Sequence, residues 1–152
     1  MPAYLFDSSA IAKQYCQEAG TDRVEAILAD PDNLCIVSRL SVVEIHSVFA
    51  TKVRRQEITA RDFDLLRRRF LSDGRQKRFR VVPISTTHFQ QAVVLLRSNA
   101  LRESLRTLDA LQLAIALDLF RLGRMEYFVT ADKALAAIAT KVGLAVVDPT
   151  VA

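Results

Sequence analysis

The sequence predicts an α/β protein of three layers, in which a central parallel sheet is flanked by helices on both faces. Two observations predict this class. Short apolar segments alternate with longer segments of helical periodicity along the whole chain. The apolar segments are continuous rather than alternating, as expected of parallel strands covered on both faces. At 152 residues the chain is expected to form one domain, residues 1–152.

The expected strands are five short apolar segments, at residues 3–6, 34–38, 80–84, 127–130 and 144–147. The third of them contains Pro83, which has no backbone N–H to donate to a neighbouring strand. We therefore expect the third strand at an edge of the sheet.

The expected helices lie between these strands, at residues 8–18, 22–30, 41–55, 60–71, 87–99, 107–122 and 132–142. Thr21 and Thr86 are expected to cap the second and fifth helices. The sixth helix is closed by Gly123, in the usual position after a helix end. It is apolar on nearly all sides, so we expect it to be buried.

Composition excludes several classes of protein. The chain is 51% hydrophobic and 25% charged, which is typical of a folded domain. No segment approaches the ~18–20 apolar residues of a membrane span, and the N-terminus lacks a signal-peptide pattern, so a cytoplasmic protein is expected. Cys16 and Cys35 are isolated, and His46 and His88 are expected to be ordinary helix-surface histidines. A zinc site is not expected.

The net charge of +4 is unevenly distributed. Residues 52–80 hold eleven basic and four acidic residues, a net charge of +7, whereas the rest of the chain is at −3. A basic block of this density is either a solvated helix face or a surface for a polyanion backbone. The sequence alone leaves both interpretations open.

Four carboxylates stand in apolar surroundings, where an ionised group is costly unless it is paired, hydrogen-bonded or bound to a metal. They are Asp7, Glu44, Asp109 and Asp132. Each also has a purely structural interpretation. Asp7 or Ser8 would cap a helix, and Asp132 would cap another. Glu44 would complete a capping box with Ser41, and the helix dipole would stabilise Asp109 in the first turn of its helix.

Topology favours a common site for the four acids. In an open parallel sheet the carboxyl ends of all strands lie along one edge, and the following helices begin there. Like charges gathered at this edge require a proton or a cation. With only oxygen ligands, the suitable cation is Mg²⁺ or Mn²⁺. Such an ion activates water, and together with the basic segment this predicts phosphodiester hydrolysis on a nucleic acid.

The sequence resembles the PIN-domain ribonucleases, and in particular the VapC-type toxins of toxin–antitoxin pairs. The matching segments are "YLFDSSAIAKQYCQEAGTDRV", "VSRLSVVEIHSVF", "RTLDALQLAIAL" and "FVTADKALAAIATKVGLAVVDP". They follow the family's order and span nearly the whole chain. One departure comes directly after Asp132, where "KALA" replaces the aromatic residue often found in the family.

The resemblance implies a three-layer PIN-like fold and a metal-dependent endoribonuclease. Asp7 and Asp109 would be the principal metal ligands, with Glu44 and Asp132 helping to hold the metals or orient the attacking water. The supporting residues would be Thr130, Ser8 and Arg106, the last touching substrate phosphate or balancing the acids. A homodimer, an RNA substrate and a cognate antitoxin that meets the region 52–80 are also implied. Two alternatives are RNA processing without an antitoxin, and a non-catalytic binding domain.

Overall fold

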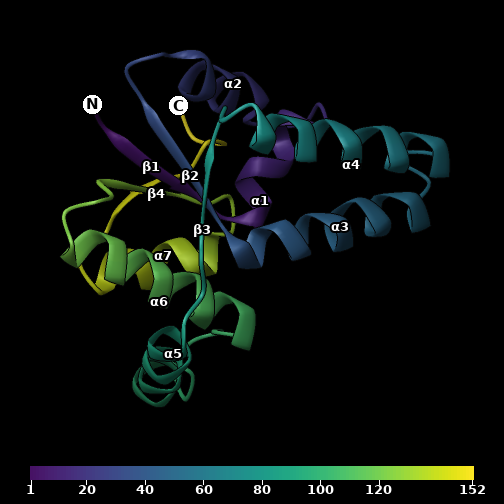
Figure 1. The fold of residues 1–152 in the computed structure, drawn as a ribbon. Coiled ribbons are helices and arrows are strands. Elements are labelled where there is room, and N and C mark those ends of the chain that lie inside the picture. The colour runs from purple at the N-terminus through teal and green to yellow at the C-terminus, as the bar shows by residue number, and fades with distance from the viewer.

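The computed structural model describes residues 1–152 and contains one five-stranded sheet, in which all neighbouring strands are parallel. The strand order is β3-β2-β1-β4-β5. The strands are β1 (Ala3–Phe6), β2 (Leu34–Ser38), β3 (Arg80–Val82), β4 (Tyr127–Val129) and β5 (Ala145–Val147). The predicted parallel sheet is confirmed, and β3 is an edge strand, as Pro83 indicated (Figure 1).

Seven α-helices and one 3-10 segment connect the strands. They are α1 (Ser8–Ile11), η1 (Ala12–Gln14), α2 (Thr21–Ala29), α3 (Arg39–Arg54), α4 (Ala60–Arg75), α5 (Thr86–Asn99), α6 (Thr107–Arg121) and α7 (Lys133–Lys141). None of these helices has the length and apolar character needed to cross a membrane.

The two faces of the sheet are covered by different helices, which gives the three layers. Successive side chains of a strand point to opposite faces. Leu5 of β1 packs in one core with α5, α6 and α7, whereas the adjacent Phe6 packs in the other core with α1, α2, α3 and α4. Figure 1 shows these two groups of helices on either side of the sheet.

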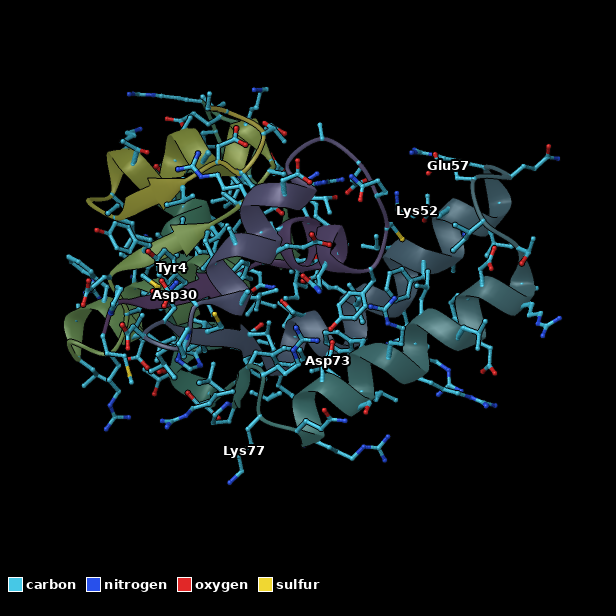
Figure 2. All side chains as sticks on the ribbon, turned by 90° about the horizontal axis from the view of Figure 1, so that it is seen from above. Tyr4, Asp30, Lys52, Glu57, Asp73 and Lys77 are labelled. Carbon is cyan, nitrogen blue, oxygen red and sulfur yellow. The ribbon has the colours of Figure 1, made fainter.

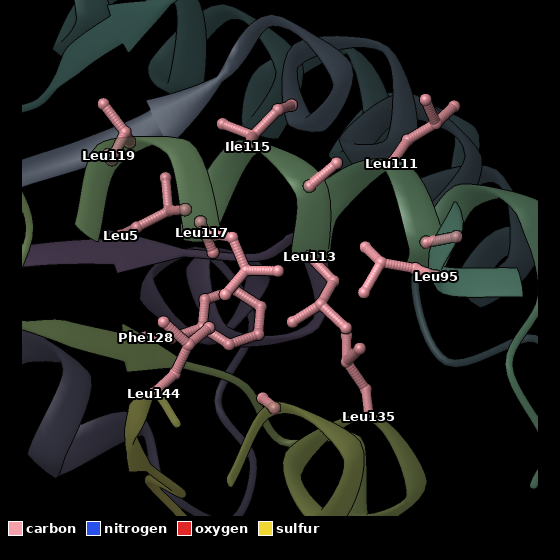
Figure 3. Packing of buried hydrophobic residues seen from close by; sticks show 14 of the residues in the cluster. Leu5, Leu95, Leu111, Leu113, Ile115, Leu117, Leu119, Phe128, Leu135 and Leu144 are labelled. Atoms are coloured by element: carbon pink, nitrogen blue, oxygen red, sulfur yellow. The ribbon is translucent and has the colours of Figure 1, made fainter. Parts of the chain in front are cut away.

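Helix α6 lies at the centre of the first core. Nine of its residues are buried, in agreement with its apolar sequence. Figure 3 shows Leu113 and Leu117 of this helix against Phe128 of β4, with Leu135 and Leu144 completing the contact. This packing holds the start of α6, and so Asp109, at a set position beside the sheet.

The first helix is shorter than predicted. It ends as α1 at Ile11, continues as η1 to Gln14, and is followed by an irregular segment, residues 15–20. Tyr15 ends the regular structure because its ring packs edge-on against Phe49 and Phe70. Its hydroxyl donates to Asp73 of α4 at 2.7 Å. These are tertiary contacts, which helical periodicity does not report.

Three helix starts also differ from the prediction. Thr21 is the first residue of α2 rather than its cap, and its hydroxyl instead accepts the Glu18 N–H at 3.0 Å. Helix α3 begins at Arg39 and is capped by Ser38, and α5 has Ser85 as its N-cap instead of Thr86. In α3 and α5 a serine one or a few positions earlier takes the cap position, whereas the N-cap of α2 is Gly20.

Gly20 is required at the start of α2. It adopts φ +90°, in the left-handed region, and a Cβ atom there would lie 2.8 Å from the carbonyl oxygen of Pro149. We expect Gly20→Ala to lower the free energy of unfolding by about 2 kcal/mol or more, since strain and overlap add. Urea denaturation followed by circular dichroism measures this. Gly143→Ala, with φ +100° but no atom within 4 Å, is the control for strain alone.

His88 is buried, so the prediction that it lies on a helix surface is wrong. Its Nδ1 accepts the Ser85 N–H at 3.0 Å, which places the ring proton on Nε2. Nε2 donates to Asp118 of α6 at 2.9 Å. The ring therefore joins the start of α5 to α6, and it has a structural explanation without a metal.

The basic segment forms a projecting pair of helices. The end of α3 and the whole of α4 lie side by side and extend beyond the sheet (Figure 1). Arg67 and Arg68 pair with Asp64 at 2.8 Å, within one helix. Most of the remaining basic side chains of this segment are exposed. The excess positive charge is thus displayed on α3 and α4.

Candidate active site

The candidate site lies where the strand order of the sheet reverses. Strand β1 has β2 on one side and β4 on the other. Helix α1, which follows β1, and helix α7, which follows β4, pack on opposite faces of the sheet. Such a switch point opens a crevice at the carboxyl ends of the strands. Asp7 directly follows β1, and Thr130 directly follows β4.

Asp7 is almost fully enclosed, with 4% of its surface exposed, and both of its oxygens accept hydrogen bonds. Oδ1 accepts from Ala10 N at 2.9 Å and from the Ser9 hydroxyl at 2.7 Å. Oδ2 accepts from the Thr130 hydroxyl at 2.5 Å. Asp7, and not Ser8, is therefore the N-cap of α1. The structural and the functional interpretation of Asp7 are compatible, because one carboxylate occupies both places.

No basic side chain neutralises Asp7. Burial, with a smaller contribution from the negative charge of Glu44, raises the pKa of its carboxyl to about 6 against the opposing hydrogen bonds. A buried acid with a neighbouring acid and no cation is an arrangement that a bound cation would relieve.

Glu44 lies in the second turn of α3 and faces the same crevice. The capping-box interpretation of Glu44 is wrong, because α3 begins at Arg39 and Ser38 is its cap. Burial raises the pKa of Glu44, and the charge of Asp109 raises it as well. The Ser8 hydroxyl lowers the pKa of Glu44, so this serine acts on the second acid rather than on the first. Asp7, Glu44 and Asp109 thus form a series: the charge of Glu44 raises the pKa of Asp7, and the charge of Asp109 raises the pKa of Glu44.

Asp109 lies in the first turn of α6, at the mouth of the crevice. Its Oδ2 accepts from Arg106 N at 3.3 Å, and the Arg106 Nε lies 3.6 Å away. The Arg106 side chain is 81% exposed and free to reach a ligand. Glu44, Arg106 and Asp109 line one cavity of about 320 Å³ together with Thr107 and Leu108.

Asp132 is connected to the site less directly. Its Oδ1 accepts from Leu135 N at 3.0 Å, so it caps α7. Its backbone N–H donates to the Thr130 hydroxyl at 3.1 Å, and Thr130 in turn donates to Asp7. No hydrogen bond or ion pair joins the Asp132 carboxylate itself to the other three acids. The structure therefore places three of the four acids in electrostatic contact and the fourth beside them.

The chain is similar to known proteins along most of its length. The sequence pattern of the PIN domain matches residues 4–141, from the first strand to the end of α7. The chain belongs to the PIN domain family. No curated protein matches it significantly.

Solved structures share the fold of this PIN domain at low sequence identity. VapC20 of Mycobacterium tuberculosis, a sarcin–ricin loop cleaving toxin, is 17% identical with a TM-score of 0.65, over 93% of this chain and 95% of that one. A toxin–antitoxin complex from Klebsiella pneumoniae is 22% identical with a TM-score of 0.58, over 96% and 97%. VapBC-1 from nontypeable Haemophilus influenzae is 14% identical with a TM-score of 0.64, over 98% and 99%.

The donors of this PIN domain site suit a hard divalent cation by their chemistry. All are carboxylate oxygens, the ligands that such ions prefer. The side chains as they stand do not form a group of three that could hold a metal ion. The observation that favours a cation is electrostatic, since the buried Asp7 and the half-buried Glu44 both have raised pKa values without a basic partner in contact.

The PIN domain also contains a buried polar network that sequence reasoning missed. Gln112 of α6 is 2% exposed, and its Nε2 donates to Glu44 Oε1 at 2.9 Å and to the Ser41 hydroxyl at 2.6 Å. Its Oε1 accepts from the Ser38 hydroxyl at 3.0 Å. A single glutamine in the most apolar helix, three residues after Asp109, was the available signal. The supporting role beside Asp7 was also predicted for Ser8, whereas the structure shows that the neighbouring Ser9 donates to the Asp7 carboxylate.

Gln112→Ala is expected to loosen Glu44 and to lower any activity of the site by roughly tenfold. Removing a hydrogen bond to a charged group costs about 1.5–3 kcal/mol, and part of that loss falls on folding. The measurement is the rate constant at saturating substrate, with the melting temperature recorded in parallel. Gln112→Glu is a matched control of equal size that replaces the donor by a second acid. It should be more damaging than Gln112→Ala if the donated hydrogen bond matters.

Proposed function

We propose that this PIN domain is a divalent-metal-dependent endoribonuclease and acts as the toxin of a toxin–antitoxin pair. The observation that carries the proposal is the series of three acids at the switch point, with Asp7 buried between the ends of two strands. Clustered acids, of which the buried Asp7 has no basic partner, suit metal-assisted hydrolysis of a phosphodiester.

Asp7, Glu44 and Asp109 are the proposed metal ligands, and Asp132 the fourth acid of the site. A bound Mg²⁺ or Mn²⁺ would supply Lewis-acid chemistry and a water of lowered pKa. Ser9 and Thr130 orient the Asp7 carboxylate by donating to its two oxygens. Gln112 and Ser8 orient Glu44. Arg106, exposed beside Asp109, is the proposed contact for substrate phosphate.

The proposed partners are an RNA substrate and a cognate antitoxin. The proposal is supported by structural neighbours described as a sarcin–ricin loop cleaving toxin and as a toxin–antitoxin complex. A homodimer is also proposed, supported by exposed apolar side chains on α5 at Phe89, Val93 and Val94. The cytoplasm, where such an RNA is found, is the proposed location, and the two cysteines are free.

The test is cleavage of total RNA by the purified protein, with and without Mn²⁺, followed by mapping of the new 5′ ends. The expected result is a small set of discrete cuts that requires the metal. Asp109→Asn is the catalytic control. Arg124→Gln, three residues past the C-terminal end of α6 and so opposite the site, is the control for a change of surface charge. Cleavage that persists in folded Asp109→Asn protein would contradict the proposal. RNA binding without cleavage by any preparation would favour the non-catalytic alternative.

A further inference from the structure

Lys13 is the only buried residue among the 21 lysines and arginines of the chain. It lies in η1, one helical turn after Ser9, and 7% of its surface is exposed. Burying an ammonium group is unfavourable unless partners compensate for the lost water. The position of this lysine, so close to the carboxyl end of β1, therefore needs an explanation.

Its protein contacts account for only part of its hydrogen-bonding capacity. Nζ donates to Glu18 Oε1 at 3.1 Å, and this is its single partner in the chain. An ammonium group has three N–H donors, so two remain for water or a ligand. Glu18 is shared as well, because its other oxygen accepts from Lys52 at 3.0 Å. Lys52 has Glu57 as a second partner at 3.3 Å, and Figure 2 shows these two residues near the α3–α4 turn.

Lys13 opens onto a cavity of about 480 Å³ that connects it with the candidate active site. Ser9, Lys13 and Glu18 line it from the segment that follows β1. Glu44, Ser47, Thr51 and Lys52 of α3 also line it, with Arg55 and Glu57 just after that helix. Glu44 belongs to the acid series, and the Ser9 hydroxyl donates to Asp7. The cavity thus joins the acid series to three basic side chains, Lys13, Lys52 and Arg55. The two lysines among them pair with Glu18 and Glu57, which also line the cavity.

We propose that Lys13 binds a backbone phosphate of the RNA strand, in the cavity adjoining the acids; this proposal rests on the proposed ribonuclease function. A phosphate offers only acceptors and a negative charge, which match the two free donors and the charge of the ammonium group. A polyanion approaching three acids is repelled unless a cation lies close by. Lys13 supplies that cation from a fixed position, whereas Arg55, which also lines the cavity, is exposed. Lys52, the third cation of the cavity, is shared between Glu18 and Glu57.

A purely structural role makes a different prediction. Lys13 would then serve only to hold the irregular segment 15–20 through its ion pair with Glu18. In that case removing Glu18 would be as damaging as removing Lys13. Under the phosphate proposal, Glu18→Gln leaves the ammonium group in the cavity and frees it further, so RNA binding is retained.

The experiment measures binding of a fluorescent single-stranded oligouridine of about 12 nucleotides, long enough to fill one binding groove. Binding is measured in EDTA, with Asp7→Asn as the background so that no cleavage occurs. We expect Lys13→Met to weaken binding about tenfold. The slope of log K against log salt should fall by about 1, the contribution of a single phosphate contact. Lys13→Arg should recover most of the affinity. Glu18→Gln should stay within about twofold, since it removes no phosphate contact.

Lys141→Met is the matched control, because this lysine lies at the opposite end of α7 from the site and pairs with Glu103. Melting curves check folding, which Lys13→Met should keep because Glu18 still has Lys52. Unchanged affinity and salt slope in Lys13→Met would overturn the proposal, as would an equal loss in Glu18→Gln. Since binding is measured without cleavage, failure of the ribonuclease proposal would appear separately, as the absence of cuts by the wild-type protein with Mn²⁺ in the cleavage assay.

Discussion

Asp7→Asn is expected to make the protein more stable at pH 7.5 and at the same time to abolish its activity. The mutant keeps the helix cap, because the asparagine carbonyl accepts the same hydrogen bonds from Ala10 and Ser9. It loses the charge, which at this position is buried and faces Glu44. Loss of a charged ligand at the reacting centre lowers the rate by roughly 10²–10³-fold.

The stability gain depends on pH in a defined direction. The pKa of Asp7 is raised from its ordinary 3.8 to about 6 in the folded protein. Between these values the folded state binds more protons than the unfolded state. The stabilisation by neutral Asp7 is therefore fully present below pH 3.8 and is lost as the pH rises through about 6. Above that pH the wild type is destabilised by up to about 3 kcal/mol relative to Asp7→Asn, and the difference narrows toward pH 4.

Urea denaturation of both proteins from pH 4 to pH 8 in EDTA measures this difference. Asp30→Asn is the control, because Asp30 is exposed and lies beyond the far end of α2, beside Tyr4 (Figure 2). A difference between Asp7→Asn and wild type that is constant with pH would contradict the raised pKa. A mutant that is more stable but equally active would show that Asp7 takes no part in catalysis.

The second large effect is expected from the metal itself. An ion that binds the folded state stabilises it by about 2.7 kcal/mol at a concentration of 100 times its Kd. For a domain of this size that corresponds to a rise in Tm of roughly 5–10 °C. Mg²⁺ or Mn²⁺ should relieve the repulsion among Asp7, Glu44 and Asp109, and EDTA should reverse the effect.

Thermal denaturation with each ion at millimolar concentration is the measurement. Asp109→Asn should reduce the response strongly, whereas Asp30→Asn should retain it. Zn²⁺ is expected to raise the Tm less than Mg²⁺ or Mn²⁺, because the site has no histidine or cysteine in contact with the acids. A Tm that does not respond to either Mg²⁺ or Mn²⁺ would contradict the proposed dependence of the activity on a metal ion.

Much of the fold could be predicted from the sequence because it depends on local patterns. The apolar runs 3–6 and 34–38 correspond to strands with the same bounds, and Pro83 placed the third strand at an edge. Errors occurred where distant contacts override a local pattern. Tyr15 leaves the helix to pack against Phe49 and Phe70, and His88 is buried because Asp118 of another helix faces it.

The same distinction between local pattern and distant contact applies to the candidate site. The sequence by itself determined which acids stand out, because a carboxylate in an apolar segment is unusual wherever the chain folds. Only the tertiary structure decided how they are held: Asp7 caps a helix and bonds to Thr130 from 123 residues away, and Gln112 holds Glu44 across two helices. It also decided that Lys13, unremarked in the sequence, opens onto the same cavity. Burial and hydrogen bonding between distant segments are properties of packing, and no local pattern of residues encodes them.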